Sequence, residues 1–488
     1  MNCKCKKYLK IGMFFIFLIF ISAIVSAIPT NYTYNYDFWE EQVASPDAYR
    51  VSDFFLGTHF GIGHFVEPQG LFIRENRIYV CDSGNNRIVI IEVDENGQHN
   101  LSRIVTSVII DGEESRLAYP MDIFECREGI IYVADTNNNR ILKLDSDWNY
   151  IMSIHRPDDD SIDDFIEFQP LKLIVDFANR IFVQVRNVNK GLMEFDSRGE
   201  FTTYMGANKV WFNMIDYIWR FFSTQEQRAR MELFIPTEYN NLALDSDGFI
   251  YVTNSTAHID PVRRLNAMGQ DILIRNGYEA PIGDIKPGNA GGRTGPSRFV
   301  DVVAFENDSY ACFDRVRGRI FMYDFQGNLL YAFGGVGNRE GFFELPAAID
   351  RMGTSLYALD ADRNSSSITR FELTAYGEKI NLALDEYKAG RYEASANVWE
   401  EVLKMNGNYD LAYIGIGRAA LRQGEYQKAM RYYSLKHYRE GYGKAFQLYR
   451  KEWMETNLWK IILILAIAVT VPLAVKKSMN LIKEIREA

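Results

Sequence analysis

The sequence has few of the residues that build metal centres, cross-links or nucleophilic active sites. Its 488 residues include only five cysteines and six histidines. The cysteines form no C-x-x-C pair, and none lies near a histidine at zinc-ligand spacing. No nucleophile motif such as G-x-S-x-G occurs. These absences argue against a disulfide framework and a zinc site, and they favour a protein that is not an enzyme.

Positive charge is also scarce. The net charge is −10, and no basic block occurs outside the termini, which argues against a nucleic-acid partner. Aromatic residues are abundant instead, with 29 Tyr and 32 Phe, and this composition favours strands. The length is sufficient for two or three domains, each with its own core.

The sequence repeats itself. The stretch "DSGNNRIVIIEVDENG" begins at Asp82, and "DTNNNRILKLDSDWN" begins at Asp135. Each copy has an apolar strand before it, a polar tip rich in Asn and a second strand, which is the pattern of a β-hairpin. Looser copies begin at Arg180, Phe249, Ser309 and Ser355.

A proline precedes each copy, and the usual spacing is about 50 residues. The prolines are Pro68, Pro120, Pro170, Pro236, Pro296 and Pro346. A period of 40 to 50 residues with four strands per unit predicts a β-propeller, here with six blades. The sixth unit lacks an outermost strand, and the segment from Asp53, "DFFLGTHFGIGHFVEPQG", resembles the last strand of the fifth unit. We therefore expect this early segment to complete the sixth blade and close the ring.

Three units place an Asp five residues before an Arg. The pairs are Asp82 and Arg87, Asp135 and Arg140, and Asp314 and Arg319. A charge-assisted hydrogen bond between the end of one strand and the start of the next would stabilise the ring. The alternative is that these side chains bind a ligand.

The motif D-x-x-N-x-R-[IV], seen in "YVCDSGNNRIVIIEVDENG" and "YVADTNNNRILKLDSDWNYI", resembles the NHL repeat. The match is close in units one and two, fair in unit five and weak in the others. The resemblance implies a six-bladed propeller that serves most often as an interaction platform. A minority of relatives are enzymes, such as a zinc-dependent lyase, and lactonases on similar propellers use calcium.

An axial metal site would require convergent ligands. The six histidines occupy no equivalent positions in the repeats, so a site with three imidazoles is not expected. Asp, Asn and Glu are plentiful, which leaves a calcium site in the propeller open. We expect no cofactor.

An insertion at residues 210–233 separates the third and fourth units. Trp211, Trp219 and Phe222 recur there at helical spacing. We interpret the insertion as a helical flap over the propeller rim. The alternative is a surface that contacts a membrane or a partner helix.

After the propeller the pattern becomes helical. Gly390 and Gly424, like Tyr392 and Tyr426, are 34 residues apart. This period and the G-x-Y-x-x-A pattern resemble the tetratricopeptide repeat. The resemblance implies a helical stack whose concave face binds a peptide or helix. Tyr387, Tyr409 and Tyr413 are candidates for that face, although each could equally belong to the core.

Both ends of the chain have membrane-type segments. Four lysines, an apolar run from Ile11 to Val25 and small residues up to Ala27 indicate a secretory signal at residues 1–27. Uncleaved, it would be an anchor with the same topology. Residues 458–476 include an apolar run flanked by Trp459 and Lys476, which predicts a transmembrane helix.

These patterns define the expected organisation of the chain. It is a signal (1–27), an NHL-type propeller (37–373), tetratricopeptide-like helices (376–457), a transmembrane helix (458–476) and a cytoplasmic tail (477–488). We expect a membrane-anchored, extracytoplasmic protein-interaction scaffold of bacterial cell-surface type, with a protein partner in a membrane transport or envelope complex. The alternative is a propeller enzyme or a glycan-binding protein with a metal-assisted axial site.

Overall fold

The structure is a computed structural model, and it describes most of the chain. The described residues are 33–162, 166–206, 238–254, 260–277, 280–285, 293, 295–363 and 365–487. They form two compact units, Met1–Gly377 and Glu378–Ala488. The predicted signal and the insertion at 210–233, with Trp211, Trp219 and Phe222, lie outside the described residues.

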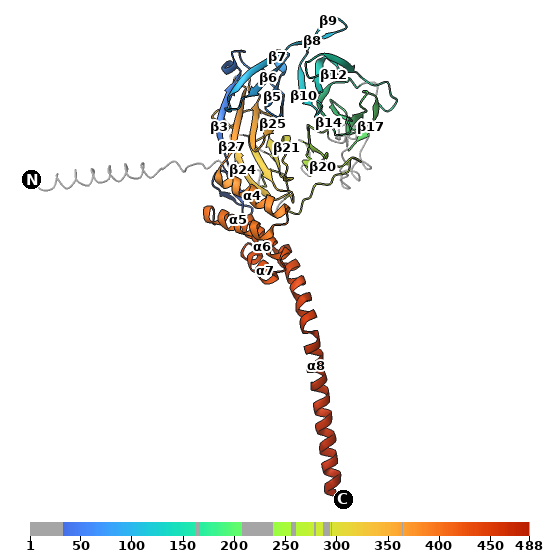
Figure 1. Ribbon diagram of the computed structural model, residues 1–488, viewed down its shortest axis with the longest axis vertical. Helices are drawn as coiled ribbons and strands as arrows, with labels where there is room; N and C mark the ends of the chain where they lie inside the picture. Colours follow the sequence, from blue (N-terminus) through green and yellow to red (C-terminus); the bar gives the residue numbers. More distant parts are fainter. Residues whose placement is uncertain are drawn as a thin grey trace, which may run out of the picture. The chain divides into compact units, whose positions relative to one another are not determined.

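The first unit is a six-bladed β-propeller, as the repeats predict (Figure 1). Four blades have four strands in simple up-and-down order, blade 5 has four such strands and two more from the N-terminal segment, and blade 4 has three strands among the described residues. Blade 1 contains β4 (Gly70–Arg74), β5 (Arg77–Asp82), β6 (Arg87–Val93) and β7 (His99–Val105). Blade 2 contains β10 (Pro120–Glu125), β11 (Ile131–Asp135), β12 (Arg140–Leu144) and β13 (Tyr150–Ile154). Blade 3 contains β14 (Pro170–Val175), β15 (Ile181–Val185), β16 (Leu192–Phe195) and β17 (Phe201–Met205).

The remaining blades follow in chain order. Blade 4 contains β18 (Asn241–Leu244), β19 (Ile250–Thr253) and β20 (Val262–Leu265). Blade 5 contains β21 (Phe299–Ala304), β22 (Tyr310–Asp314), β23 (Arg319–Tyr323) and β24 (Leu329–Gly334). Blade 6 contains β25 (Pro346–Met352), β26 (Ser355–Asp360) and β27 (Ser367–Leu373), with β3 (Tyr49–Leu56) as its outer strand. Around the axis, the innermost strands contact one another in the order β4, β10, β14, β18, β21, β25 and back to β4.

The early segment closes the ring. Strand β3 pairs antiparallel with β27 from Leu56 opposite Ser367 to Tyr49 opposite Leu373. The prediction from the sequence is confirmed, although the strand begins four residues before Asp53. A blade built from both ends of the propeller sequence leaves no open seam between its first and last strands.

Two hairpins were not predicted. Strands β1 (Tyr34–Tyr36) and β2 (Gln42–Ala44) extend blade 5, where Tyr34 pairs with Ala332 of β24. Strands β8 (Ser107–Ile110) and β9 (Glu113–Arg116) form a hairpin that projects between blades 1 and 2 (Figure 1).

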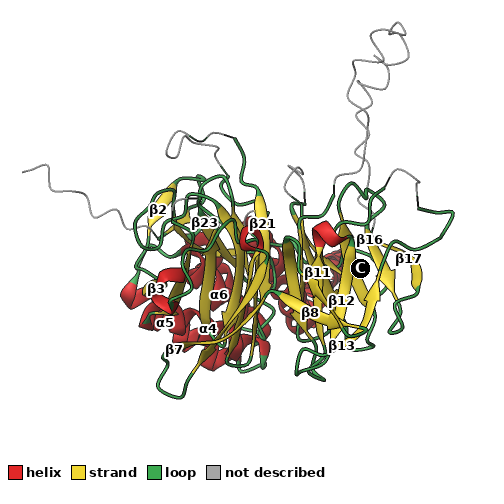
Figure 2. Cartoon of the chain, turned by 90° about the horizontal axis from the view of Figure 1, so that it is seen from above, coloured by secondary structure: helices red, strands yellow, loops and turns green. Residues whose placement is uncertain are grey.

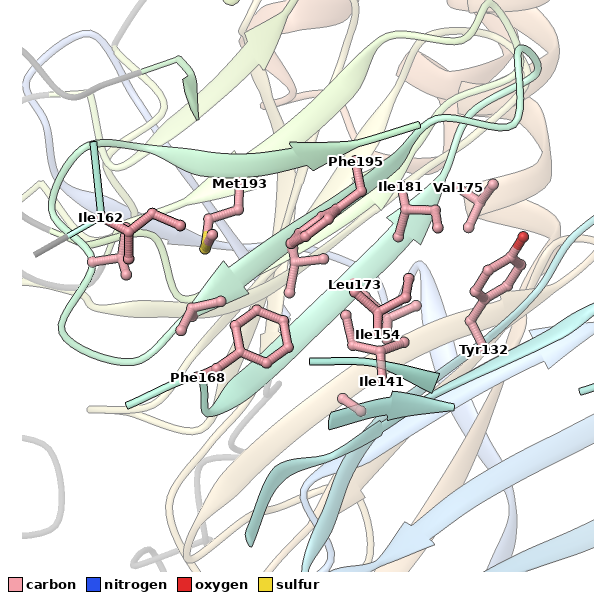
Figure 3. Close-up of a cluster of buried hydrophobic side chains, with 14 of the residues drawn as sticks. Tyr132, Ile141, Ile154, Ile162, Phe168, Leu173, Val175, Ile181, Met193 and Phe195 are labelled. Carbon is pink, nitrogen blue, oxygen red and sulfur yellow. The ribbon is translucent and has the colours of Figure 1, made fainter. Parts of the chain in front are cut away.

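The propeller core lies between neighbouring blades. Figure 3 shows the cluster between blades 2 and 3, where Ile141 and Ile154 pack with Leu173 and Phe195. Both faces of a blade are apolar because each face packs against a different neighbour. Figure 2 shows the strands of these sheets in yellow. Single blades could not bury this surface, so the ring is the smallest stable arrangement.

The second unit consists of helices, and α4 begins just before its boundary. The helices are α4 (Ala375–Lys388), α5 (Tyr392–Met405), α6 (Asp410–Arg422), α7 (Tyr426–Leu435) and α8 (Arg439–Glu487). Gly390 and Gly424 lie in equivalent turns with φ of +78° and +81°, a backbone conformation that glycine adopts without steric cost. The 34-residue period therefore corresponds to one helix–turn–helix.

The interior of the helical unit depends on close contact between large aromatic rings and glycines. Trp399 and Tyr433, the large residues of the two repeats, are 2% and 1% exposed. A Cβ on Gly415 would lie 2.4 Å from Trp399 Nε1, and one on Gly417 would lie 2.6 Å from Tyr433. Helix α6 is thus shaped to receive one ring from α5 and one from α7.

Candidate functional site

The repeated aspartates connect loops, turns and strands within a blade. Asp82 is fully buried and accepts hydrogen bonds from Val66 N (2.7 Å), Asn85 Nδ2 (2.9 Å) and Arg87 Nε (2.7 Å). In this way its carboxylate joins the incoming loop to the hairpin. The ion pair with Arg87 follows the expectation from the spacing.

Asp135 repeats this arrangement in blade 2. It accepts hydrogen bonds from Ala118 N, Asn138 Nδ2 and Arg140 Nε, each at 2.8 Å. The Asn-rich tip predicted from the sequence therefore has two uses. One Asn donates to the aspartate, and the next, Asn86 or Asn139, adopts the left-handed conformation that ends the turn.

The third expected pair, Asp314 and Arg319, does not form. Arg319 Nη1 lies 2.5 Å from Asp284 Oδ2, and the nearest cation to Asp314 is Arg317 at 3.9 Å. In the fifth unit Arg317 replaces the Asn of the tip, and it also binds Asp284, at 3.1 Å. The expectation is wrong here because a carboxylate from the segment between blades 4 and 5 competes for both arginines.

Asp284 also anchors the N-terminal hairpin. The hydroxyls of Tyr34 and Tyr36 donate to Asp284 Oδ1 at 2.5 Å and 2.8 Å. Burial is the main reason why the pKa of Tyr34 is raised well above its usual value. This buried cluster was not predicted, because no repeat pattern marks Asp284.

A second set of repeat residues connects neighbouring blades. Ser83 Oγ donates to the carbonyl of Pro120 in the next blade, and Thr136 Oγ1 donates to that of Pro170, both at 2.6 Å. Sequence reasoning missed these residues, although the hydroxyl follows the aspartate in both clear copies. The Asp therefore organises its own blade, and the Ser or Thr binds the next one.

An axial cavity of about 560 Å³ is lined by the innermost strands of all six blades. Its charged lining includes Asp122, Lys172, Asp301 and Asp350. Each of the three carboxylates accepts a hydrogen bond from a backbone N–H of the following blade. The donors are Leu173 N to Asp122 (2.9 Å), Ile349 N to Asp301 (2.7 Å) and Ile73 N to Asp350 (2.6 Å).

Burial changes the proton affinity of these axial groups. It raises the pKa of Asp301 to about 8 and that of Asp350 to about 7, and it raises the pKa of Asp122 as well. For Lys172, burial lowers the pKa, but the charges of Asp122 and Asp301 outweigh it and raise the pKa overall. Lys172 Nζ donates to Gln69 O at 3.3 Å and to Asp122 Oδ1 at 3.4 Å.

The hydrogen bonds to Asp122, Asp301 and Asp350 connect each of their blades to the next around the axis. Within the described ranges, no three His, Cys, Asp or Glu side chains are grouped closely enough to hold a metal ion. The three cysteines of the described part, Cys81, Cys126 and Cys312, are buried and unbonded.

The mouth of the cavity has a different character. Phe177 is 47% exposed, and the guanidinium of Arg127 lies 3.7 Å from the centre of its ring. Both residues line the cavity. The guanidinium covers one face of the ring, and the exposed remainder of the ring could contact a ligand.

The three tyrosines expected on the helical unit differ in exposure. Tyr409 is 1% exposed and packs against Trp399, with ring centres 6.2 Å apart. Its candidacy for a binding face is therefore wrong, because its position just before α6 turns the ring into the core. Tyr387 and Tyr413 are half-buried; the latter donates to Gly407 O and lies under Lys436 Nζ.

Helix α8 contains a long apolar segment. It is 49 residues long, and its most apolar window has a mean hydropathy of 2.5, with none of that window buried. Side chains such as Ile464, Leu465 and Val469 are 60–65% exposed. A helix of this length and composition could cross a membrane.

A comparison with known protein families supports the helical repeats. A family model described as tetratricopeptide repeat matches residues 380–440. No curated protein matches the chain. Among solved structures, the chain is similar to virginiamycin B lyase from Staphylococcus aureus, with 12% identity and a TM-score of 0.42. The match covers 67% of this chain and all of that one.

Two further structures show the same order of similarity. A streptogramin B lyase is 13% identical, with a TM-score of 0.40 over 67% of this chain and all of its own. Hydrazine synthase from Kuenenia stuttgartiensis is 11% identical, with a TM-score of 0.35 over 63% of this chain and 84% of its own. At this level of similarity, neither activity transfers to the present chain.

Proposed function

We propose that the protein is a single-pass membrane protein that carries a non-catalytic scaffold outside the cytoplasm. The propeller and the helical repeats would bind protein partners, and the complex would serve membrane transport or the cell envelope. Stacked helical repeats offer the kind of extended surface that binds peptides and helices. Two such architectures in one chain favour a role in assembly.

The single observation that carries this proposal is helix α8. It continues from the helical unit into an apolar segment whose side chains no other described part of the chain covers. In water this exposure would be unfavourable by roughly 25 cal/mol per Å² of apolar surface. A bilayer removes that cost, and Trp459 and Lys476 are residue types suited to its two interfaces.

The proposed topology depends on the two termini. The signal-like segment at residues 1–27 would direct the propeller across the membrane. Lys476 and Lys477 would then flank the span on the cytoplasmic side, with residues 477–488 as a short tail. The boundaries proposed from the sequence, with the span at 458–476, fit within α8.

The cavity mouth favours one alternative, a propeller that binds a small ligand such as a glycan. The observation behind it is the exposed ring of Phe177 beside Arg127. Phe177→Ala would abolish such binding and leave membrane assembly unchanged. Glycan arrays probed with the full-length protein and with this variant test the alternative.

The scaffold proposal is tested by crosslinking in intact membranes, followed by purification of the full-length chain. We expect a protein partner in stoichiometric amount. Trp399→Ala, which disturbs the helical repeats, should lose a partner that binds them, whereas Phe177→Ala should retain it. Recovery of the protein alone would contradict the proposal.

A further inference from the structure

Positive charge is concentrated in one part of this acidic chain. Residues 415–451 contain nine Lys or Arg and two Asp or Glu, a net charge of +7, although the whole chain carries −10. This segment forms most of α6, all of α7 and the first three turns of α8. Six residues, including Glu452 and Glu455, separate it from the proposed span.

Part of this charge is arranged along one face of α8. Arg439, Tyr442, Phe446 and Arg450 follow one another at intervals of three, four and four residues, so their side chains share a face of the helix. We call these four residues the stalk stripe. Tyr442 is 41% exposed and Phe446 is 46% exposed, and both arginines are exposed.

Helix α7 adds a further arginine beside the stripe. Gln427 Nε2 of α7 donates to Tyr449 Oη of α8 at 3.0 Å, which fixes the side of α8 that faces α7. Arg431 is exposed and lies one turn after Gln427. Because α7 and α8 run antiparallel, Arg431 lies near the level of Phe446. None of Arg431, Arg439 and Arg450 forms an ion pair with any described residue.

The composition of this surface fits a protein partner. Arg and aromatic residues are enriched among the residues that dominate binding energy at protein interfaces. Tyr442 and Phe446 form an apolar strip, and the arginines beside it can bind carboxylates. Such a surface would recognise an acidic amphipathic helix. The paucity of acidic residues nearby removes competition for the arginines.

Distance from the bilayer argues against lipid headgroups as the occupant. From Leu458, where the proposed span begins, α8 rises about 12 Å to Arg450 and about 28 Å to Arg439 at 1.5 Å per residue. The Debye length is about 8 Å at physiological ionic strength. A tilt of about 20° changes these heights little, so most of the stripe is beyond the reach of anionic headgroups.

We propose that the stalk stripe, together with Arg431, is the docking site for an acidic amphipathic helix of a partner protein. This inference depends on the proposed membrane anchoring, because α8 sets the height of the site. The stripe spans about 17 Å, which requires a partner helix of about three turns.

The test uses the full-length protein in nanodiscs of zwitterionic lipid. The probe is a fluorescent 18-residue peptide with Leu at helical i, i+3, i+4 and i+7 spacing and Glu elsewhere. The wild type should bind it more tightly than the same peptide with Lys in place of Glu. Arg431→Glu, Arg439→Glu and Arg450→Glu combined should weaken binding at least about tenfold, and Phe446→Ala alone about tenfold.

A matched variant controls for total charge. Arg116→Glu, Arg198→Glu and Arg363→Glu alter three propeller arginines that are 80–83% exposed, and this variant should bind the peptide like the wild type. Equal loss in both triple variants, or no preference for the Glu peptide, would overturn the proposal. So would stripe-dependent binding to phosphatidylglycerol vesicles in place of the peptide, or stripe-dependent pairing of two copies. Failure of α8 to insert in the nanodisc would instead refute the membrane anchoring.

Discussion

The propeller and the helical unit differ in net charge and in the contacts that join their interiors. The first unit contains 36 Lys or Arg and 51 Asp or Glu, a net charge of −15, whereas the second contains 18 and 13, a net charge of +5. Several of the propeller carboxylates are buried, and they accept hydrogen bonds that connect loops, turns and neighbouring blades. The helical repeats instead join through aromatic rings packed on glycines.

The difference reflects how each architecture is connected. A ring must fix every blade to the next, and directional hydrogen bonds to buried carboxylates define that register. A helical stack satisfies its backbone within each helix, so packed side chains position its neighbours, together with a few side-chain hydrogen bonds such as Ser395 Oγ to Ala383 O.

The largest effect is expected from removing the strand that closes the ring. Deletion of residues 33–56 removes β1, β2 and β3, so blade 6 loses its outer strand. We expect a loss that approaches the whole net stability of the ring, about 5–15 kcal/mol. Hydrogen exchange should show rapid exchange in β27, while α5 and α6 stay protected. Unchanged protection in β27 would refute closure by β3.

Asp82→Ala should destabilise the propeller by about 3–5 kcal/mol, because Arg87 and two further donors lose their acceptor. Asp314→Ala removes two backbone hydrogen bonds but no close ion pair, so about 1–3 kcal/mol is expected. Urea unfolding of the full-length protein in detergent measures both. Equal losses would contradict the different roles of the two aspartates.

Trp399→Ala should destabilise the helical unit by about 3–5 kcal/mol through the cavity it leaves. Gly415→Ala places a methyl group against the same ring and should cost about 1–3 kcal/mol. Gly443→Ala is the matched control, because nothing lies within 4 Å of its added Cβ. The helical transition in calorimetry should fall to lower temperature in the first two variants, whereas Gly443→Ala should not lower it, because Ala is the better helix former.

The axial carboxylates predict a dependence of stability on pH. The folded-state pKa values of Asp301 (about 8) and Asp350 (about 7) lie above the unfolded value of about 3.9. The stability that these two carboxyl groups contribute to the folded propeller is therefore complete below about pH 4 and is lost as the pH rises through 7 and 8. Asp301→Asn should flatten the fall in melting temperature between pH 5 and 9, whereas Asp145→Asn, in an exposed turn, should not. A melting temperature that rises over this range would contradict the assignment.

The smallest effect is expected from metal ions. Calcium or zinc should leave the melting temperature of the propeller unchanged if the axial cavity holds no ion. A rise of several degrees on addition of either ion would favour the metal-assisted alternative. Asp122→Asn, which changes an axial carboxylate, would then be expected to reduce that rise.

Much of the fold could be predicted because its signals are periodic. The spacing of about 50 residues and the second period of 34 residues identify both architectures, and the incomplete sixth repeat identifies the closing strand. Asp284 could not be found in this way, since it lies outside the repeated strands. Asp122, Lys172 and Asp301 occupy equivalent positions of their innermost strands, but the residue type at that position differs between blades, so no shared motif marks it. Tyr409 was assigned to a binding face because an aromatic residue beside a helix gives no indication of which way it points.

The Asp–Arg pairs show the limit of a repeated motif. In blades 1 and 2, the spacing and the Asn at the tip occur together, and the ion pair forms. In blade 5 the spacing is kept but the Asn is replaced by Arg317, and both arginines bind Asp284. A pairing read from spacing alone fails when a distant segment supplies a better-placed carboxylate.

Extraction of isolated membranes with alkaline carbonate shows whether α8 anchors the protein in a membrane. We expect the full-length protein to stay in the membrane pellet and a chain that ends at Asn457, with its signal cleaved, to be released to the soluble fraction. Release of the full-length protein by carbonate would refute anchoring by α8.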